Sequence, residues 1–556
     1  MFYKGDNRMA EETLQSIKTK LWAMANELRG NMDASEYKNY ILAFMFYRYL
    51  SEHQEQYLVK NKVLDIPEGD SVNTAYRDAA SGDDLTDYLE DISTTLGYAI
   101  APEDTWASLT EKINNSEVIP SDYQTIFDHF NKNATLNSDA AQDFRGVFND
   151  INLGDSRLGS STNERAKSLN RIVGLVAEVE YKSEDGKDIL GSIYEYLISQ
   201  FAATAGKKGG EFYTPHEVSQ ILAKIVTKDV KTSDETFTVY DPTCGSGSLL
   251  LTVQDELPGG NKPGAIKFYG QELNTTTYNL ARMNLMMHGV SFNNMTLSNA
   301  DTLESDWPDG MDASGTDHPR SFDAVVANPP YSAHWDNNPG KIKDPRFGEY
   351  GKLAPKTKAD YAFVLHSLYH LNSTGTMAIV LPHGVLFRGG AEEAIRKTLI
   401  NKNYLDAVIG LPANLFFGVS IPTIILVFKK NKQTKDILFI EASKEFSKGK
   451  NQNTLTAENI DKIMDTYKER QDIERYAHVA GVDEVKKNEY NLNIPRYVDT
   501  FEEEQPVDVD KLVADISATD KKISSLQDEI NAIMEELTAS DPVAQQQLSK
   551  IKRMLR

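Results

Sequence analysis

Residues 328–331 are of types that can act on a planar amine. They are Asn328, Pro329, Pro330 and Tyr331, and they follow an apolar segment at 322–327 that predicts a buried strand. The Asn328 amide oxygen and the Pro329 carbonyl oxygen can both accept hydrogen bonds from one NH2 group, while Tyr331 offers a ring for stacking. The motif therefore predicts methyl transfer to a nitrogen that is normally a poor nucleophile. Two consecutive prolines also occur as a simple turn, so the prediction depends on what lies upstream.

A glycine turn lies upstream, between a strand predicted at 237–240 and an apolar helix start at 249–251. Its residues are Asp241, Pro242, Thr243, Cys244, Gly245, Ser246, Gly247 and Ser248. A strand, a glycine turn and a helix N-terminus are the usual way for a backbone to approach a nucleotide-like ligand. Position 250 is Leu where a dinucleotide fingerprint has a third glycine, which disfavours a pyrophosphate site.

Two acidic residues follow the glycine turn. Glu272 ends a strand predicted at 266–272 and can accept hydrogen bonds from the two hydroxyls of a ribose, and Asp301 can accept one from the amino group of an adenine ring. Either acid alone is also typical of a solvated strand end. Taken in order with residues 328–331, they predict a pocket for S-adenosylmethionine. Cys244 is expected to line this pocket and not to act as a nucleophile, because no His is near it in the sequence.

A helix start precedes both motifs. Thr214 is expected as the N-cap, Pro215 as the first helical residue, and Glu217 as the partner of Thr214 in a capping box. The segment is either just a well-capped helix or a site where the positive helix end holds the methionine carboxylate. On the second interpretation the cofactor-binding residues here are Glu211, Phe212, Tyr213, Thr214, Pro215 and His216.

Together these motifs resemble those of the amino-methyltransferases of DNA that methylate adenine N6, in which they occur in this order. The chain is more specifically similar to the modification subunits of type I restriction-modification systems. The further segments that carry this resemblance lie at 21–22, 28–32, 410–417, 421–423 and 490–497. The resemblance covers nearly the whole chain. It implies an α/β S-adenosylmethionine-dependent methyltransferase fold, a seven-stranded mixed sheet with helices on both faces, with an all-helical N-terminal domain and a C-terminal helical or coiled-coil tail.

The resemblance also implies a function and partners. The implied reaction is transfer of a methyl group from S-adenosylmethionine to the N6 amine of adenine in a specific DNA sequence, which protects host DNA from cleavage. The implied partners are double-stranded DNA, a specificity subunit, a restriction subunit and a second copy of this chain. Three alternatives stay open: an amine methyltransferase acting on protein glutamine or ribosomal RNA, a solitary DNA methyltransferase, and a catalytically idle assembly subunit.

The composition is compatible with a large cytoplasmic protein. The chain has 556 residues, 40% of them hydrophobic, and one Cys, which excludes a disulfide framework. No leader is expected because residues 1–6 have no apolar signal core, and no membrane span is expected because the apolar run at 421–428 is too short to cross a bilayer. No metal site is expected either, because His366 and His370 lack the intervening Glu of a zinc protease.

The net charge of −23 is unusual for a protein that binds DNA phosphates, so any DNA contact should be local or shared with a partner. The basic segment at 332–358 is either a solvated lid or a grip on the strand around an extruded base, and Lys341, Lys343 and Arg346 are its candidate contacts. Phe416 or Phe417 is the candidate for a second stacking wall beside that base.

Three domains are expected: a helical N-terminal domain at 1–180, a methyltransferase domain at 181–445, and a C-terminal region at 446–556 with a partner-binding helix. The stretch at 40–50 is too apolar for a surface helix and predicts core. In the tail, apolar residues repeat every seven positions at Ile516, Ile523, Ile530 and Leu537. This pattern predicts a coiled-coil seam, with an intramolecular helical hairpin as the alternative.

Overall fold

The computed structural model describes residues 34–116, 118–179, 190–205, 214–231, 235–304, 320–449, 452–500 and 508–554. The chain forms two compact units, Met1–Asp499 and Thr500–Arg556, and each is described by itself. Within the described ranges, no helix combines the length and the apolar character needed to cross a membrane.

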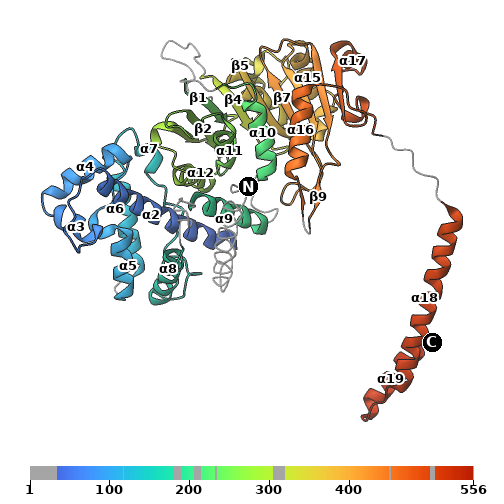
Figure 1. Cartoon of the computed structure of the whole chain (residues 1–556), viewed down its shortest axis with the longest axis horizontal. Helices are drawn as coiled ribbons and strands as arrows, with labels where there is room; N and C mark the ends of the chain where they lie inside the picture. The colour runs from blue at the N-terminus through green and yellow to red at the C-terminus, as the bar shows by residue number, and fades with distance from the viewer. Residues whose placement is uncertain are drawn as a thin grey trace, which may run out of the picture. The chain divides into compact units, whose positions relative to one another are not determined.

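The N-terminal part of the first unit is helical (Figure 1). Its elements are α2 (Ala34–Lys60), α3 (Val72–Ala79), α4 (Asp84–Leu96), η1 (Pro102–Asp104), α5 (Trp106–Asn114), α6 (Pro120–Asn133), α7 (Ala141–Phe144) and α8 (Thr162–Ala177). Residues 40–47 of α2 are at most 6% exposed, which confirms the prediction of a core helix. Aromatic rings close this core, and Phe127 of α6 stacks on Phe148 with ring centroids 4.7 Å apart.

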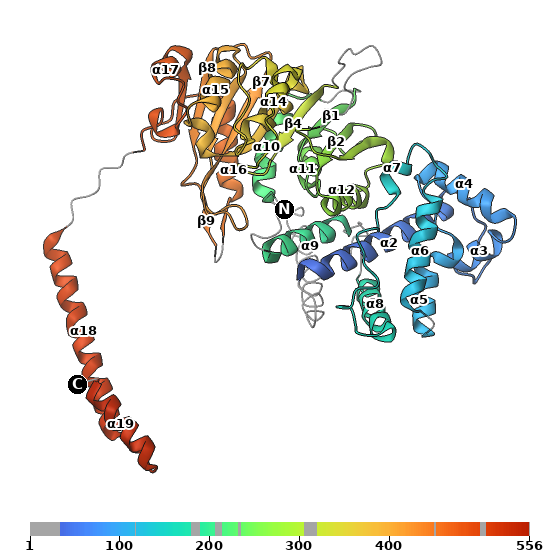
Figure 2. The same ribbon diagram turned by 180° about the vertical axis from the view of Figure 1, so that it is seen from behind.

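A nine-stranded mixed sheet forms the centre of the rest of this unit (Figure 1 and Figure 2). In spatial order its strands are β11 (Ala477–Gly481), β8 (Asp436–Glu441), β6 (Leu405–Gly410), β7 (Thr423–Lys429), β5 (Leu371–Pro382), β4 (Phe322–Ala327), β1 (Phe237–Asp241), β2 (Ile266–Glu272) and β3 (Met295–Asn299). β7 and β11 run antiparallel to their neighbours, and the other neighbouring pairs are parallel. The segments predicted as strands from their apolar runs all lie in this sheet.

Both faces of the sheet are covered, which explains why its strands are continuous apolar runs. One face packs against α10 (His216–Thr227), α11 (Ser248–Glu256), α12 (Thr275–Met287) and α16 (Ala457–Glu469). The other face packs against α13 (Pro345–Gly348), α14 (Asp360–Tyr369), α15 (Ala391–Asn401) and α17 (Val482–Lys487). Neighbouring residues alternate between the two cores, as Val239 and Tyr240 of β1 do.

The sheet is larger than the predicted seven strands. The seven strands from β6 to β3 form the expected mixed sheet, and β8 and β11 extend it at one edge. β11 pairs with β8 from Ala477 opposite Ile440 to Gly481 opposite Asp436. The domain boundary predicted at residue 445 therefore falls between two paired strands. β11 has only five residues and does not alternate regularly in burial, so it leaves little signal in the sequence.

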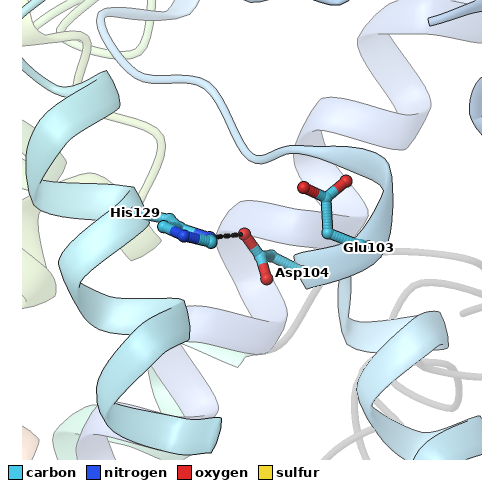
Figure 3. Close-up of side chains that lie close together, drawn as sticks. All are labelled: Glu103, Asp104 and His129. Atoms are coloured by element: carbon cyan, nitrogen blue, oxygen red, sulfur yellow. Dashed lines mark hydrogen bonds and ion pairs between the residues drawn. The ribbon is translucent and has the colours of Figure 1, made fainter. Parts of the chain in front are cut away.

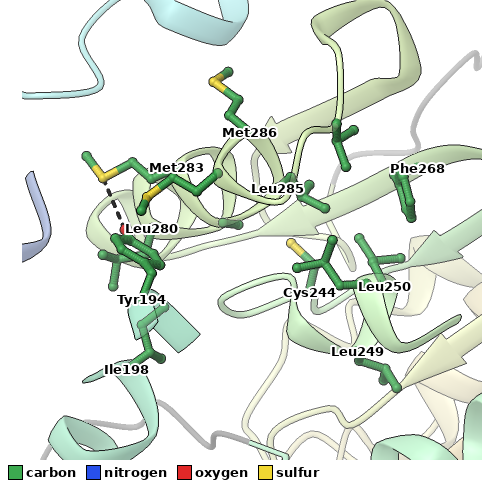
Figure 4. Close-up of a cluster of buried hydrophobic side chains, with 14 of the residues drawn as sticks. Tyr194, Ile198, Cys244, Leu249, Leu250, Phe268, Leu280, Met283, Leu285 and Met286 are labelled. Carbon is green, nitrogen blue, oxygen red and sulfur yellow. Dashed lines mark hydrogen bonds between the residues drawn. The ribbon is translucent and has the colours of Figure 1, made fainter. Parts of the chain in front are cut away.

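One face of α12 contacts the N-terminal helices, and another supports the glycine turn. The Tyr49 hydroxyl of α2 donates to Met286 O (2.8 Å), and the Tyr194 hydroxyl of α9 (Leu190–Ala205) contacts Met283 Sδ (3.2 Å). Figure 4 shows Tyr194 and Ile198 on the side of α12 away from Cys244 and Leu250. The helical domain and the glycine turn thus share one supporting helix.

Arg282 of α12 binds the C-terminal end of α7. Its side chain is 2% exposed, and Nη1 donates to three backbone carbonyls, those of Gln142 (3.0 Å), Asp143 (3.0 Å) and Arg145 (3.1 Å). A guanidinium can bind several carbonyls at once, so it can satisfy the last carbonyls of a short helix, which have no partner within the helix.

The second unit consists of α18 (Val509–Glu536) and α19 (Pro542–Met554). α19 folds back on the end of α18, where Lys552 Nζ donates to Glu535 O and Leu537 O (both 3.1 Å). α19 has 13 residues and α18 has 28, so this hairpin is partial. The heptad residues Ile516 and Ile523 are 52% and 56% exposed, so the predicted seam lies on the open surface of α18.

We expect Arg282→Ala to lower the free energy of unfolding by about 3 kcal/mol, because one buried and two partly buried carbonyls lose a charged donor. Urea denaturation followed by circular dichroism measures the change. Arg77→Ala is the control, since that side chain is 50% exposed and its contact with Glu111 is a surface ion pair. Equal changes in the two variants would contradict the role of Arg282.

Candidate functional site

The site is formed where three parallel strands end side by side. β1 lies between β2 and β4, with Asp241 opposite Gly270 and Tyr240 opposite Val325. The carboxyl ends of parallel strands point to the same edge of the sheet. This order brings the glycine turn after β1, Glu272 at the end of β2 and the motif 328–331 after β4 to one edge.

The glycine turn curves from β1 into α11. Gly245 and Gly247 have φ values of 55° and 77°, which favour residues without a Cβ. Cys244 N donates to Gln271 O (2.9 Å), and Gly247 N donates to Cys244 O (2.8 Å), so the turn is hydrogen-bonded to β2. A Cβ added at Gly245 would meet no atom within 4 Å, which leaves room beside the turn for a ligand.

Glu272 joins the glycine turn to the next helix. Its Oε2 accepts from Gly245 N (3.2 Å) and its Oε1 accepts from Asn274 N (2.8 Å), where α12 begins. The carboxylate is therefore already oriented at the strand end, as a ribose acceptor needs to be. Asp301, the second acid, accepts from Leu303 N (2.9 Å) and lies after β3.

Two residues beside Glu272 were missing from the sequence-based set. Leu273 is 67% exposed, which is unusual for a large apolar side chain next to an ordered acid, and it leaves an apolar surface open beside Glu272. Asn299 Nδ2 donates to Glu272 O (2.8 Å) and Leu273 O (3.0 Å) and so fixes that segment. An apolar residue directly after a strand-terminal acid is the signal that could have identified Leu273.

Burial changes the acidity of two groups in the turn. Burial raises the pKa of Asp241 to about 7; the hydrogen bond from Thr243 N opposes this shift, and the negative charge of Glu272 adds to it. Burial also raises the pKa of the Cys244 thiol well above its usual value, with Asp241 and Glu272 acting in the same direction. A neutral, buried thiol is a poor nucleophile, so the geometry agrees with a packing role for Cys244.

Among the described residues at the start of α10, the predicted capping box is not formed. The helix begins at His216 after Pro215, with no side-chain cap there. The Thr214 hydroxyl instead accepts a hydrogen bond from Asn328 Nδ2 (3.0 Å). The prediction of a capping box was wrong because the Thr214 hydroxyl is bound to the Asn328 side chain and not to the helix backbone. Glu211, Phe212 and Tyr213 lie outside the described residues.

The motif 328–331 forms a compact polar tip. Asn328 is 9% exposed, and its Oδ1 accepts from the Tyr331 hydroxyl (2.9 Å). With Thr214 on Nδ2 and Tyr331 on Oδ1, the amide orientation is fixed from both ends. Burial, and next the nearby Asp360 carboxylate, raise the pKa of Tyr331, so this hydroxyl stays protonated as a donor. The Phe416 ring meets Tyr331 edge-on at 6.2 Å and is buried, whereas Phe417 is half-buried.

The segment 332–358 is largely folded back on the domain. Arg346 is 2% exposed, forms an ion pair with Asp344 (2.7 Å) and donates to Thr302 O (2.9 Å). The structure thus corrects the expectation that Arg346 contacts DNA, because this guanidinium is used inside the protein. Charge counts in a sequence cannot separate buried from exposed arginines. Lys341 pairs with Glu304 (2.7 Å), and Lys343 lies exposed on the surface.

His366 and His370 belong to the core, with no exposed surface. His366 Nε2 lies 2.7 Å from the Tyr240 hydroxyl, and burial lowers its pKa well below the usual value. Among the described residues, Glu103, Asp104 and His129 have donor atoms close enough to surround a metal ion. His129 Nδ1 lies 2.7 Å from Asp104 Oδ2, and Figure 3 shows this contact joining η1 to α6. We assign this cluster a structural role in the helical domain.

Two sequence families match the chain. Residues 185–506 match N-6 DNA Methylase, and residues 17–176 match the HsdM N-terminal domain. The chain is 36% identical to the type I restriction enzyme MpnII methylase subunit of Mycoplasma pneumoniae, over 95% of this chain and 97% of that one. It is 32% identical to the MjaVII methylase subunit of Methanocaldococcus jannaschii, over 89% and 80% of the two chains.

Solved structures give the same result. The methyltransferase subunit of a type I restriction-modification system from Streptococcus thermophilus superposes with a TM-score of 0.80 at 44% identity, over 88% of this chain and 100% of that one. A type I modification subunit from Vibrio vulnificus, at 17% identity and a TM-score of 0.56, shares the fold.

The raised pKa of Asp241 predicts a pH-dependent stability. A folded-state pKa of about 7, against an ordinary value of 3.8, means that the folded state favours the neutral acid. The wild type should therefore lose stability relative to Asp241→Asn as the pH rises from about 4 to about 7, by about 1.4 kcal/mol per pH unit. Urea denaturation of both proteins at pH 5, 6, 7 and 8 measures this difference. A constant difference across the series would refute the assignment.

Proposed function

Because the chain belongs to the N-6 DNA methylase family and to the methylase subunits of type I restriction enzymes, we propose that it uses S-adenosylmethionine to methylate adenine N6 in a specific DNA sequence. As the modification subunit of such a complex it would protect host DNA from cleavage. The observation that carries the site assignment is the hydrogen bond between Thr214 and Asn328, which joins the cofactor side to the amine-binding tip. Its place of action would be the cytoplasm, where that DNA lies.

The residues at the sheet edge fit the proposed cofactor. Glu272 faces the glycine turn as an oriented acceptor for ribose hydroxyls, and the exposed Leu273 offers an apolar face to the adenine. The open space beside Gly245 allows the backbone to approach the ligand. His216 opens α10, whose positive N-terminal end suits the methionine carboxylate. When bound, S-adenosylmethionine supplies a methyl group on a positively charged sulfur.

Asn328 and Pro329 act on the acceptor nitrogen. The lone pair of adenine N6 is delocalised into the ring, and hydrogen bonds to both of its protons favour a pyramidal nitrogen with a localised lone pair. A carbonyl oxygen accepts two hydrogen bonds, so Asn328 Oδ1 can hold the amine while it accepts from Tyr331. Since Asn328 is fixed before the substrate arrives, no reorganisation is needed during the reaction.

The target base must leave the DNA duplex to reach this tip. The reacting atoms have to approach within about 3–3.5 Å in line, which a stacked base does not allow. Extrusion costs a few kcal/mol, and stacking on Tyr331 offsets part of this cost. Phe416 lies edge-on to Tyr331 and supports its ring, so Phe417, which is half-buried, is the better candidate for the opposite wall.

The negative net charge of the chain bears on which partners it needs to bind DNA. With a net charge of −23, the chain neutralises few phosphates by itself, and base-edge recognition needs side chains placed in a groove. We propose that a specificity subunit reads the DNA and binds the exposed stripe of α18, and that a restriction subunit and a second copy of this chain join the complex. The exposed Ile516, Ile523 and Ile530 have the spacing of a coiled-coil seam.

The first test concerns Asn328. Asn328→Ala should abolish methyl transfer while leaving cofactor affinity nearly unchanged, because this amide acts on the target amine and not on the cofactor. Tritium transfer from labelled S-adenosylmethionine and calorimetric titration measure the two effects. Glu272→Ala is the reciprocal variant and should weaken cofactor binding by about 1–3 kcal/mol, since the ribose hydroxyls lose their acceptor. Loss of cofactor binding in Asn328→Ala would show that this residue belongs to the other half of the site.

The second test concerns the tail. A chain ending at residue 505 should stay folded and bind S-adenosylmethionine, because the first compact unit ends at Asp499. It should no longer assemble with the specificity subunit or methylate specific DNA. Co-expression followed by size-exclusion chromatography measures assembly. If the truncated chain co-elutes with that subunit and modifies the same sites, the docking surface lies in the helical N-terminal domain.

A further inference from the structure

Asp360 links the amine-binding tip to a buried ion network on the face of the sheet away from α10. This residue opens α14 and is 1% exposed. Its Oδ1 accepts from Ser332 N (2.7 Å), the first amide after Tyr331, and its Oδ2 accepts from Arg388 Nη1 (3.0 Å). One carboxylate thus contacts both the tip and a side chain from a distant part of the chain.

Ser332 is where the backbone needs support. Its φ is 51°, a left-handed conformation that is unfavourable for a residue with a Cβ. The neighbouring backbone is held as well, since Ala359 N donates to Ala333 O (3.0 Å). The chain therefore turns sharply after Tyr331 and is fixed against the start of α14. This turn sets the direction in which the Tyr331 ring and hydroxyl point.

Arg388 holds the Asp360 carboxylate in place through its contact with Oδ2. Its Nη1 also donates to Glu392 Oε1 (2.8 Å), and Glu392 is 2% exposed. A Cβ at Gly384 would lie 2.3 Å from Arg388 Nε, so a glycine there leaves room for the guanidinium. A buried carboxylate needs such a partner, because an unpaired charge in the interior is strongly unfavourable.

We propose that Asp360 is a positioning residue for methyl transfer: it holds the turn after Tyr331 so that Tyr331 and Asn328 keep the geometry that receives the flipped adenine. The inference rests on the proposed function. Thr214 fixes the tip from the cofactor side, and Asp360 fixes it from the opposite core. Asp360 itself touches neither the amine nor the cofactor, so its effect is transmitted through the backbone of Ser332.

Asp360→Asn tests this proposal with little change in volume. The amide has one oxygen for the two donors that now share the carboxylate, so either Ser332 N or Arg388 loses its acceptor. Asp406→Asn is the matched control. That aspartate is 4% exposed and also accepts two hydrogen bonds. Its donors are two side chains away from the tip, the Tyr467 hydroxyl (2.9 Å) and Arg470 Nη1 (3.0 Å).

The experiment uses the complete complex with its specificity subunit. We expect Asp360→Asn to lower the single-turnover rate of methyl transfer by about 10- to 100-fold, with affinity for S-adenosylmethionine within about twofold of wild type. Hydrogen exchange of a peptide covering 328–335 should become faster. With 2-aminopurine in place of the mapped target adenine, the fluorescence increase on binding should also fall. Asp406→Asn should change none of these, although it can lower the unfolding midpoint.

Two results would overturn the proposal. One is an Asp360→Asn complex that is folded and transfers methyl groups at the wild-type rate. The other is an equal loss of rate in both variants, which would assign the effect to general destabilisation. If Asp360→Asn does not assemble with the specificity subunit, hydrogen exchange of the unassembled chain decides in its place. Faster exchange at 328–335 than in the wild-type chain supports the proposal, and unchanged exchange there overturns it. The proposed function is judged separately, since a wild-type complex without methyl transfer would contradict it before any variant is compared.

Discussion

The placement of β1 between β2 and β4 is the constraint on which the site depends. Parallel pairing on both sides of β1 brings three carboxyl ends to one edge, although the glycine turn and residues 328–331 are far apart in the sequence. The crossover helices that parallel strands require then cover both faces of the sheet. One of these helices, α12, holds the glycine turn and also anchors the N-terminal domain through Arg282. The same helix therefore fixes the position of the helical domain and the shape of the glycine turn.

The polar groups at this edge are fixed before any ligand binds. Asn328 is held by Thr214 on one side and by Tyr331 on the other, and Glu272 is held by two backbone amides. Buried amides and carboxylates without partners would be costly, so each contact stabilises the fold and also orients a group that the proposed function assigns to a ligand. This double use explains why Thr214 does not cap α10. A cap would satisfy one helical amide, whereas the contact with Thr214 orients the Asn328 side chain, which we propose acts on the target amine.

Strands and core helices could be predicted from the sequence because burial on both faces requires long apolar runs, as in residues 322–327 and 424–428. The glycine turn could be predicted because the positive φ values of Gly245 and Gly247 favour residues without a Cβ. Contacts between side chains far apart in the sequence could not. Three such features depend on tertiary packing: the burial of Arg346, the hydrogen bond of Thr214 to Asn328 in place of a helix cap, and the pairing of β11 with β8. Leu273 was missed because one apolar residue after an acid has no periodicity.

The negative net charge of the chain and the exposed apolar stripe on α18 have a common explanation if this chain performs methyl transfer and a partner subunit recognises the DNA, as we propose. Under the proposed function, the reaction needs one extruded base and one oriented amide, and the residues assigned to both lie within a few positions of Asn328. Reading several base pairs needs a wide basic surface, which conflicts with a net charge of −23. Large apolar side chains on α18 are about half exposed, at 52% for Ile516, 56% for Ile523 and 45% for Ile530, a pattern that is unfavourable in an isolated helix and typical of a helix that binds a partner. If a partner reads the DNA, as we propose, the catalytic chain can serve different target sequences without any change in its own active site.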